Sequence, residues 1–268
     1  KTGRGNRVWI EILKFLAVLT PINLIMVFAG EAIKAALFQK SVINEEISMI
    51  IQLYECALGI GLVVLYCCCI EKRTFMSMGF MKRHVCKQYI KGACVGAMLI
   101  SALVWMGVLF NTFIFNGFNV NLDKKSIFLF LGGFLLQGFY EELVFRGFFM
   151  ISIIRKNTIF VAVMVNSILF GLTHGFNNGF QVLALLNLIL FGIFESIYLL
   201  KTGNIWGISA IHSMWNFIQG NIYGFNVSGM AQSQSIFIFK ISNCEIFRGG
   251  TFGLEGSLLT TIVLLSAI

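Results

Sequence analysis

Two adjacent carboxylates, Glu141 and Glu142, lie inside an apolar segment of the chain. Gln137 precedes them by one helical turn, and Arg146 follows Glu142 by four residues. Placing an ionised side chain in lipid costs about 2.5–3.5 kcal/mol even on the most lenient insertion scales. We therefore expect these ionisable residues to face a polar cavity inside a helical bundle and to take part in chemistry.

Helical geometry separates the two glutamates. Glu142 and Arg146 are four residues apart, so they share a helix face and can pair. Pairing lowers the cost of holding both charges in a low-dielectric site. Glu141 points about 100° away from Glu142 and lacks this counter-charge. A carboxylate held in this way suits a general base for water.

Further polar side chains fall in two later apolar runs. Two of the three histidines in the chain, His174 and His212, are found there, and Asn216 follows His212 by four residues. At a rise of 1.5 Å per residue, Glu141, His212 and Asn216 fall about 12–20 Å from the inner membrane surface, and His174 roughly 25 Å. These side chains are predicted to share one site near mid-membrane. The alternative is that the ion pair only fixes helix packing and that each histidine bonds a backbone carbonyl.

Composition indicates the elements that must position these groups. The chain of 268 residues is 57% hydrophobic and 12% charged, with a mean hydropathy of +0.85. Soluble domains carry about 25% charged residues. We therefore predict an all-α fold, a polytopic integral membrane helical bundle that forms a single domain over residues 1–268. About eight transmembrane helices are expected, at roughly 15–37, 47–70, 89–115, 127–150, 159–176, 180–200, 204–223 and 252–268.

The net charge of +8 is interpreted through its distribution. Basic residues lie mostly at the ends of apolar runs, which is typical of topology signals and of contacts with anionic lipid, and this excludes nucleic acid as a partner. The N-terminus and alternate loops contain more Lys and Arg than the remaining loops do. They contain Lys1, Arg4, Arg7, Lys72, Arg73, Lys82, Arg83, Lys87, Lys91, Arg155, Lys156 and Lys201. The positive-inside rule therefore predicts that both termini are cytoplasmic.

Three short motifs appear in order along the polar spans. They are Glu141-Glu142-x-x-x-Arg146, Phe170-x-x-x-His174 and His212-x-x-x-Asn216. They resemble the motifs of the CAAX prenyl protease and bacteriocin-processing family, also called the CPBP or Abi family. The resemblance covers roughly residues 137–217. It implies an intramembrane protease in a multi-pass membrane protein, and we expect the plasma membrane of a prokaryote.

The resemblance also implies a role for each residue. Glu141 would activate the attacking water, with His174 beside it. His212 and Asn216 would polarise the scissile carbonyl and hold the developing oxyanion. The remaining two motif residues, Glu142 and Arg146, would support the site.

The sequence leaves two alternatives for a metal ion. Family members are often described as metalloproteases, and His174, His212 and Glu141 have the donor types of a zinc site with an open position. The chain has no His-Glu-x-x-His motif. A metal-free site in which Glu141 and His174 orient water is equally compatible.

The implied substrate is a prenylated protein or an amphipathic small peptide, as in CAAX-type cleavage or in bacteriocin and pheromone processing. The expected partners are membrane lipid and that peptide or lipidated protein. A non-catalytic immunity or regulatory protein of the same fold is the main alternative. A proton-linked carrier is another, but the sequence shows no symmetry between halves. Glu195 stands where the family usually has a small or apolar residue, and it is expected to shape substrate choice or to pair with a nearby base.

Overall fold

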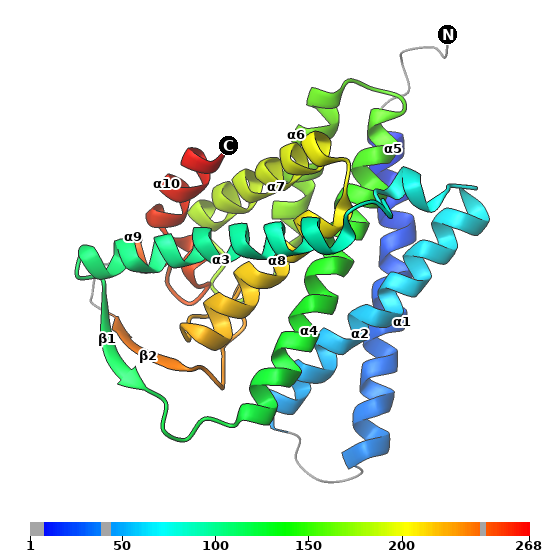
Figure 1. Ribbon diagram of the computed structural model, residues 1–268. Coiled ribbons are helices and arrows are strands. Elements are labelled where there is room, and N and C mark those ends of the chain that lie inside the picture. Colours follow the sequence, from blue (N-terminus) through cyan, green and yellow to red (C-terminus); the bar gives the residue numbers. More distant parts are fainter. Residues whose placement is uncertain (1–7, 39–43, 242–244) are drawn as a thin grey trace.

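The computed structural model describes residues 8–38, 44–241 and 245–268. Figure 1 shows a bundle of helices with a two-stranded ribbon at one side. The first half comprises α1 (Val8–Phe38), α2 (Glu45–Leu65), α3 (Val85–Leu109), β1 (Phe113–Phe118), α4 (Lys124–Glu142) and α5 (Ile151–Ile154). The second half comprises α6 (Ile159–Thr173), α7 (Val182–Thr202), α8 (Ile205–Phe217), β2 (Phe237–Ile241), α9 (Glu245–Arg248) and α10 (Leu258–Ala267).

Short 3₁₀-helical or π-helical segments connect several of these helices. The π-helical turns are η1 (Tyr66–Ile70), η3 (Leu143–Met150) and η4 (Ile218–Ile222), and the 3₁₀ turns are η2 (Phe75–Met78) and η5 (Leu254–Gly256). The α4, η3 and α5 segments follow one another without a break, so residues 124–154 form one long span.

Five helices in the described part of the chain are long and apolar enough to cross a membrane. They are Val8–Leu37, Glu45–Ile70, Val85–Leu109, Lys124–Ile154 and Val182–Thr202. The helices in the other predicted spans are shorter, because α6 has 15 residues, α8 has 13 and α10 has 10. The mostly helical, multi-pass architecture is confirmed, whereas eight spans remains a prediction.

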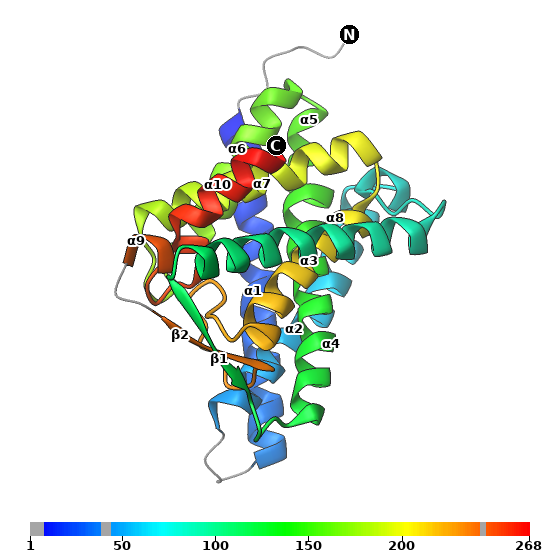
Figure 2. The same cartoon turned by 60° about the vertical axis from the view of Figure 1, so that its left-hand side comes forward.

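The purely α-helical prediction was wrong in one region, where β1 and β2 form an antiparallel pair. We predicted that the third span would continue to residue 115, but α3 ends at Leu109, and Asn111 takes a left-handed φ of 54°. Beyond it, Phe115 lies opposite Phe239 with ring centroids 5.7 Å apart. Cross-strand aromatic pairs of this kind stabilise a β-ribbon. Figure 2 shows the ribbon below α3.

Local capping explains where the helices that carry the polar residues begin. The side chain of Asp123 accepts a hydrogen bond from the backbone of Lys125 (2.9 Å) at the start of α4. Thr158 and Asn204 cap α6 and α8 in the same way. Such side chains satisfy backbone N–H groups that the first helical turn leaves unpaired. Gly203, with a left-handed φ of 63°, ends α7 directly before the cap of α8.

Glycines allow α8 to approach its neighbours closely. A Cβ at Gly92 of α3 would lie 2.0 Å from the carbonyl oxygen of Gly207, and one at Gly96 would lie 2.4 Å from that of Ile211. On the other side, Gly138 of α4 lies against Ser213 of α8. Small residues at such crossings let helix backbones pack together in membranes. The histidine-bearing helix α8 is thereby held between α3 and α4, as Figure 1 shows.

Candidate active site

The two glutamates are the last residues of α4, at the point where the helix widens into η3. π-Helical turns inside α-helices occur frequently at functional sites. The wide turn is supported from outside by Arg73, whose guanidinium donates to the carbonyl oxygen of Phe148 (3.1 Å) and to the hydroxyl of Ser152 (2.5 Å). Arg73 therefore stabilises the segment that follows the glutamates.

Glu142 forms a fully buried cluster with two partners. Its Oε1 accepts a hydrogen bond from the guanidinium of Arg146 at 2.9 Å, and both side chains are completely shielded from solvent. The predicted i, i+4 pair is thus confirmed. The same Oε1 lies 2.8 Å from Nδ1 of His212. Because an ionised carboxylate only accepts hydrogen bonds, Nδ1 of His212 carries the proton.

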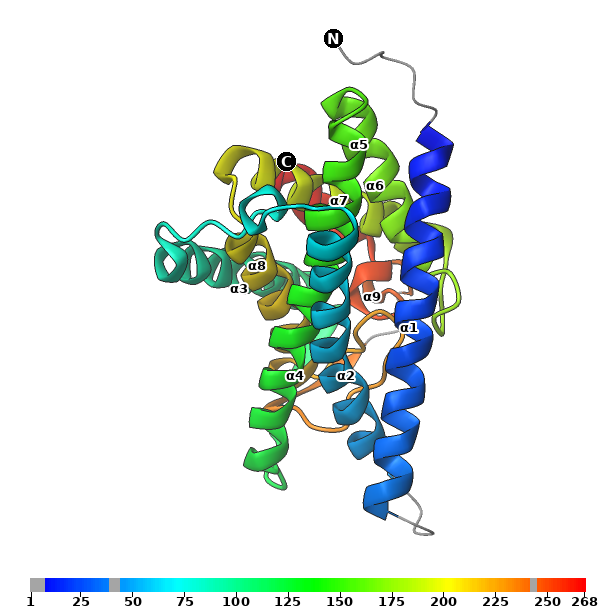
Figure 3. The ribbon, with the colours of Figure 1, turned by 90° about the vertical axis from the view of Figure 1, so that its right-hand side faces the viewer.

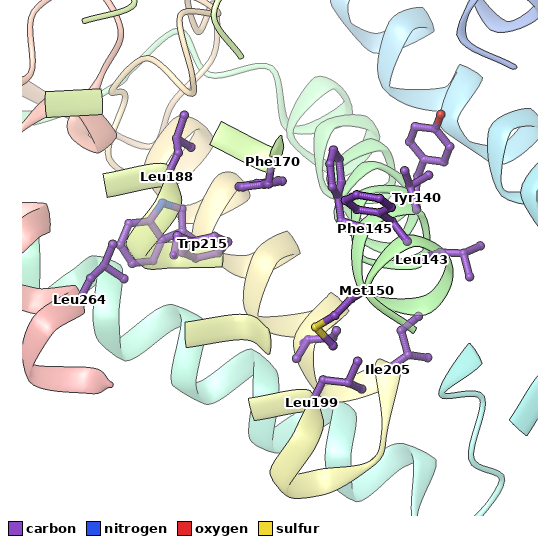
Figure 4. Packing of buried hydrophobic residues seen from close by; sticks show 14 of the residues in the cluster. Tyr140, Leu143, Phe145, Met150, Phe170, Leu188, Leu199, Ile205, Trp215 and Leu264 are labelled. Atoms are coloured by element: carbon purple, nitrogen blue, oxygen red, sulfur yellow. The ribbon is translucent and has the colours of Figure 1, made fainter. Parts of the chain in front are cut away.

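His174 lies at the C-terminal cap of α6. Its Nδ1 is 2.9 Å from the carbonyl oxygen of Phe170, which also only accepts, so this nitrogen carries the proton too. The ring centroids of Phe170 and His174 are 4.9 Å apart. The guanidinium of Arg146 lies 4.5 Å from the centre of the Phe170 ring. Phe145 and Phe170 pack edge-on, with ring centroids 5.1 Å apart. Figure 4 shows both among the buried hydrophobic residues.

Glu141 meets both histidines. Its Oε1 accepts a hydrogen bond from the side-chain amide of Gln137. Its Oε2 is buried, with no hydrogen-bond partner among the described residues. This oxygen lies 4.0 Å from Nε2 of His174 and 3.7 Å from Nε2 of His212. Both separations are longer than a direct hydrogen bond.

Asn216 reaches Glu141 through an intermediate residue. Its side-chain amide donates to the Oε1 of Gln137 at 2.9 Å, and Gln137 in turn donates to Glu141. We assigned no role to Gln137 from the sequence. Its position four residues before Glu141, on the same helix face, was the available signal.

These side chains line one cavity of about 740 Å³. Glu141, His174, His212 and Asn216 all form part of its wall, together with Gln137. The two remaining motif residues, Glu142 and Arg146, are buried behind this wall. The structure therefore brings side chains of α4, α6 and α8 to a shared polar space, and the cavity is the candidate active site.

The arrangement of these side chains gives limited support for a metal-binding site. The three side chains proposed as ligands, His174, His212 and Glu141, offer two imidazole nitrogens and a carboxylate oxygen, which are donor types that zinc accepts. Over residues 8–38, 44–241 and 245–268, however, no group of three His, Cys, Asp or Glu is arranged to hold a metal ion.

Glu195 lies outside the cavity wall, in the middle of α7. It is completely buried, and in the described structure its carboxylate forms neither a hydrogen bond nor an ion pair within 4.0 Å. The expected direct pairing with a base is therefore not seen in this part of the chain.

Comparison with known proteins agrees with this site. A family model described as type II CAAX prenyl endopeptidase, Rce1-like, matches residues 123–218. That segment runs from the cap of α4 to the end of α8 and contains all three motifs. Residues 123–218 are therefore similar to a domain of this family. This similarity indicates protease activity and a peptide substrate. No curated protein matches the chain.

Proposed function

We propose that the protein is an intramembrane endopeptidase that uses a glutamate-activated water. The observation that carries the proposal is the approach of both Nε2 atoms, from His174 and His212, to the free oxygen of Glu141 on a cavity wall. The family match supports the reaction class. The apolar spans around the site support a substrate that is itself amphipathic or lipid-modified, such as a prenylated protein or a small peptide.

The proposed first step is activation of water. Because Nδ1 carries the proton in both neutral histidines, both Nε2 atoms are hydrogen-bond acceptors. A water held between Oε2 of Glu141 and one of these nitrogens would donate a hydrogen bond to each, and a contact of 3.7–4.0 Å is compatible with such a bridge. Glu141 then takes the proton as the water oxygen attacks the scissile carbonyl carbon.

The second part of the proposal concerns the oxyanion. His212 keeps its proton on Nδ1, where Glu142 accepts the hydrogen bond, so its Nε2 accepts a hydrogen bond from the attacking water and does not donate to the oxyanion. The amide of Asn216 uses one N–H for Gln137 and has a second for the substrate oxygen. Preorganised donors of this kind stabilise the charge that develops in the transition state. Glu141 finally returns its proton to the leaving amine.

The test is a pair of glutamate variants in purified protein. Glu141→Gln should lower cleavage of prenylated or amphipathic test peptides by about 10²–10⁴-fold, because the general base is lost. The matched control is Glu45→Gln, since Glu45 is exposed at the start of α2 and does not line the cavity. Full activity in Glu141→Gln overturns the general-base assignment. A cellular phenotype that persists without cleavage favours the non-catalytic immunity protein.

A further inference from the structure

The cavity extends from Glu141 toward one end of the bundle. Each helix that lines it contributes only part of its length. From α1 and α2, the lining residues fall between Leu19 and Lys34 in the second half of α1 and between Gln52 and Cys56 near the start of α2. The later helices contribute Phe170 and Thr173 at the end of α6, residues between Asn187 and Phe191 in the first half of α7, and residues between His212 and Asn216 at the end of α8. Figure 3 shows α1 ending and α2 beginning at the same end of the molecule. The cavity therefore runs from mid-bundle toward the end of the molecule where α1 ends and α2 begins.

The wall at that end is open to the surroundings. Glu31 of α1 lines the cavity with 64% of its side chain exposed, and it pairs with Lys34 at 2.8 Å. Gln52 of α2 also lines it and is exposed. Asn177 and Asn178, which follow α6, also line the cavity. Amides along the wall can replace the hydrogen bonds that a peptide backbone loses when it leaves water.

The opposite end of the bundle carries the denser set of basic residues. The α2–α3 connection holds Lys72, Arg73, Lys82 and Arg83, and Lys87 lies in the first turn of α3. The α5–α6 connection holds Arg155 and Lys156, and α7 ends near Lys201. Lys124 and Lys125 lie at the cavity end, at the start of α4. The positive-inside rule counts Lys and Arg in short loops and assigns the richer end to the cytoplasm.

We propose that the substrate reaches Glu141 from the extracytoplasmic face, at the end of the bundle where α1 ends and α2 begins. The substrate class is then a peptide segment presented at the outer side of the membrane, such as part of a translocated peptide, and not the cytoplasmic C-terminus of a lipidated protein. The substrate statement rests on the proposed protease function. The direction of access rests only on the cavity and the charge distribution.

Labelling of single cysteines in cells tests the direction of access. Gln52→Cys at the open end of the cavity and Lys82→Cys in the basic connection are each placed in a chain whose seven native cysteines are replaced by serine. Both parent positions are exposed. A membrane-impermeant maleimide should label Gln52→Cys in intact cells, and Lys82→Cys only after lysis. The reverse pattern, or no labelling of Gln52→Cys in either sample, overturns the proposal.

Two additional measurements distinguish a failure of the proposed access route from a failure of the proposed protease activity. Adding Glu141→Gln should remove proteolysis and leave the labelling pattern unchanged, so full proteolysis in this variant contradicts the proposed enzyme chemistry and not the access route. If the cysteine-free chain does not fold, an epitope inserted after Asn119 in the otherwise unchanged chain replaces it, since Asn119 lies between β1 and α4 at the cavity end. Antibody binding to intact cells supports the proposal, and binding only after lysis overturns it.

Discussion

His212 joins the two adjacent glutamates. Its Nδ1 lies 2.8 Å from Oε1 of Glu142, and its Nε2 lies 3.7 Å from Oε2 of Glu141. One carboxylate therefore sets the orientation and tautomer of the imidazole, while the other faces the nitrogen that remains available. Neighbouring residues of the same type thus have different surroundings and should respond differently to substitution.

Stability should separate the two glutamates. Glu142→Ala leaves the fully buried Arg146 without its carboxylate, so we expect a loss of about 3–5 kcal/mol in the free energy of unfolding. Glu141→Ala removes a group that forms no close ion pair, and we expect a much smaller change. Unfolding of both purified variants in the same detergent measures the difference. Equal stabilities would contradict the structural role of Glu142.

The two histidines should affect turnover more than substrate binding. His174→Ala and His212→Ala each remove one of the nitrogens near Glu141, and we expect kcat to fall by about 10²–10⁴-fold with KM nearly unchanged. Steady-state kinetics on one peptide gives both constants. A rise in KM at constant kcat would instead indicate that the histidines only bind the substrate.

Gln137 and Asn216 should be energetically coupled, because both belong to the chain of hydrogen bonds that ends at Glu141. Hydrogen bonds to charged groups contribute about 1.5–3 kcal/mol, so Gln137→Leu should lower kcat/KM by roughly 10–100-fold. Asn216→Ala should cost less in the Gln137→Leu background than in the unchanged chain, and the loss that remains measures the proposed second role of Asn216 at the substrate oxygen. Fully additive losses in this double-mutant cycle would show that the hydrogen bond between the two residues contributes nothing.

Close packing of α8 should be required for activity. Gly96→Leu places a side chain where even a Cβ would lie 2.4 Å from the carbonyl oxygen of Ile211, directly before His212. We expect loss of folded protein or displacement of α8 with loss of cleavage. The matched control is Gly61→Ala on α2, where no heavy atom lies within 4 Å of the new Cβ. Wild-type activity in Gly96→Leu would mean that this helix contact is dispensable.

Removal of metal ions should leave the reaction intact, because the proposed steps use only side chains of the chain and water. Activity after treatment with a strong chelator, together with elemental analysis of the purified protein, checks this expectation. Stoichiometric zinc that is required for cleavage would replace the metal-free mechanism with one in which His174, His212 and Glu141 act as ligands.

Features local to one helix could be predicted from the sequence. The pairing of Glu142 with Arg146 follows from a spacing of four residues, and the apolar character of the long spans follows from composition. The β1–β2 ribbon was not predicted, because it pairs residues more than a hundred positions apart, and Phe-rich segments suit strands and buried helices equally.

The sequence by itself determined which polar residues share a helix face and that their helices belong in a membrane. Only the tertiary structure decided that His212 lies next to both glutamates, that Asn216 donates a hydrogen bond to Gln137, and toward which end the cavity runs. The reason is that these contacts depend on how closely and at what rotation α8 packs against α4. That packing is set where Gly138 meets Ser213, by a fit between surfaces that no spacing along one helix specifies.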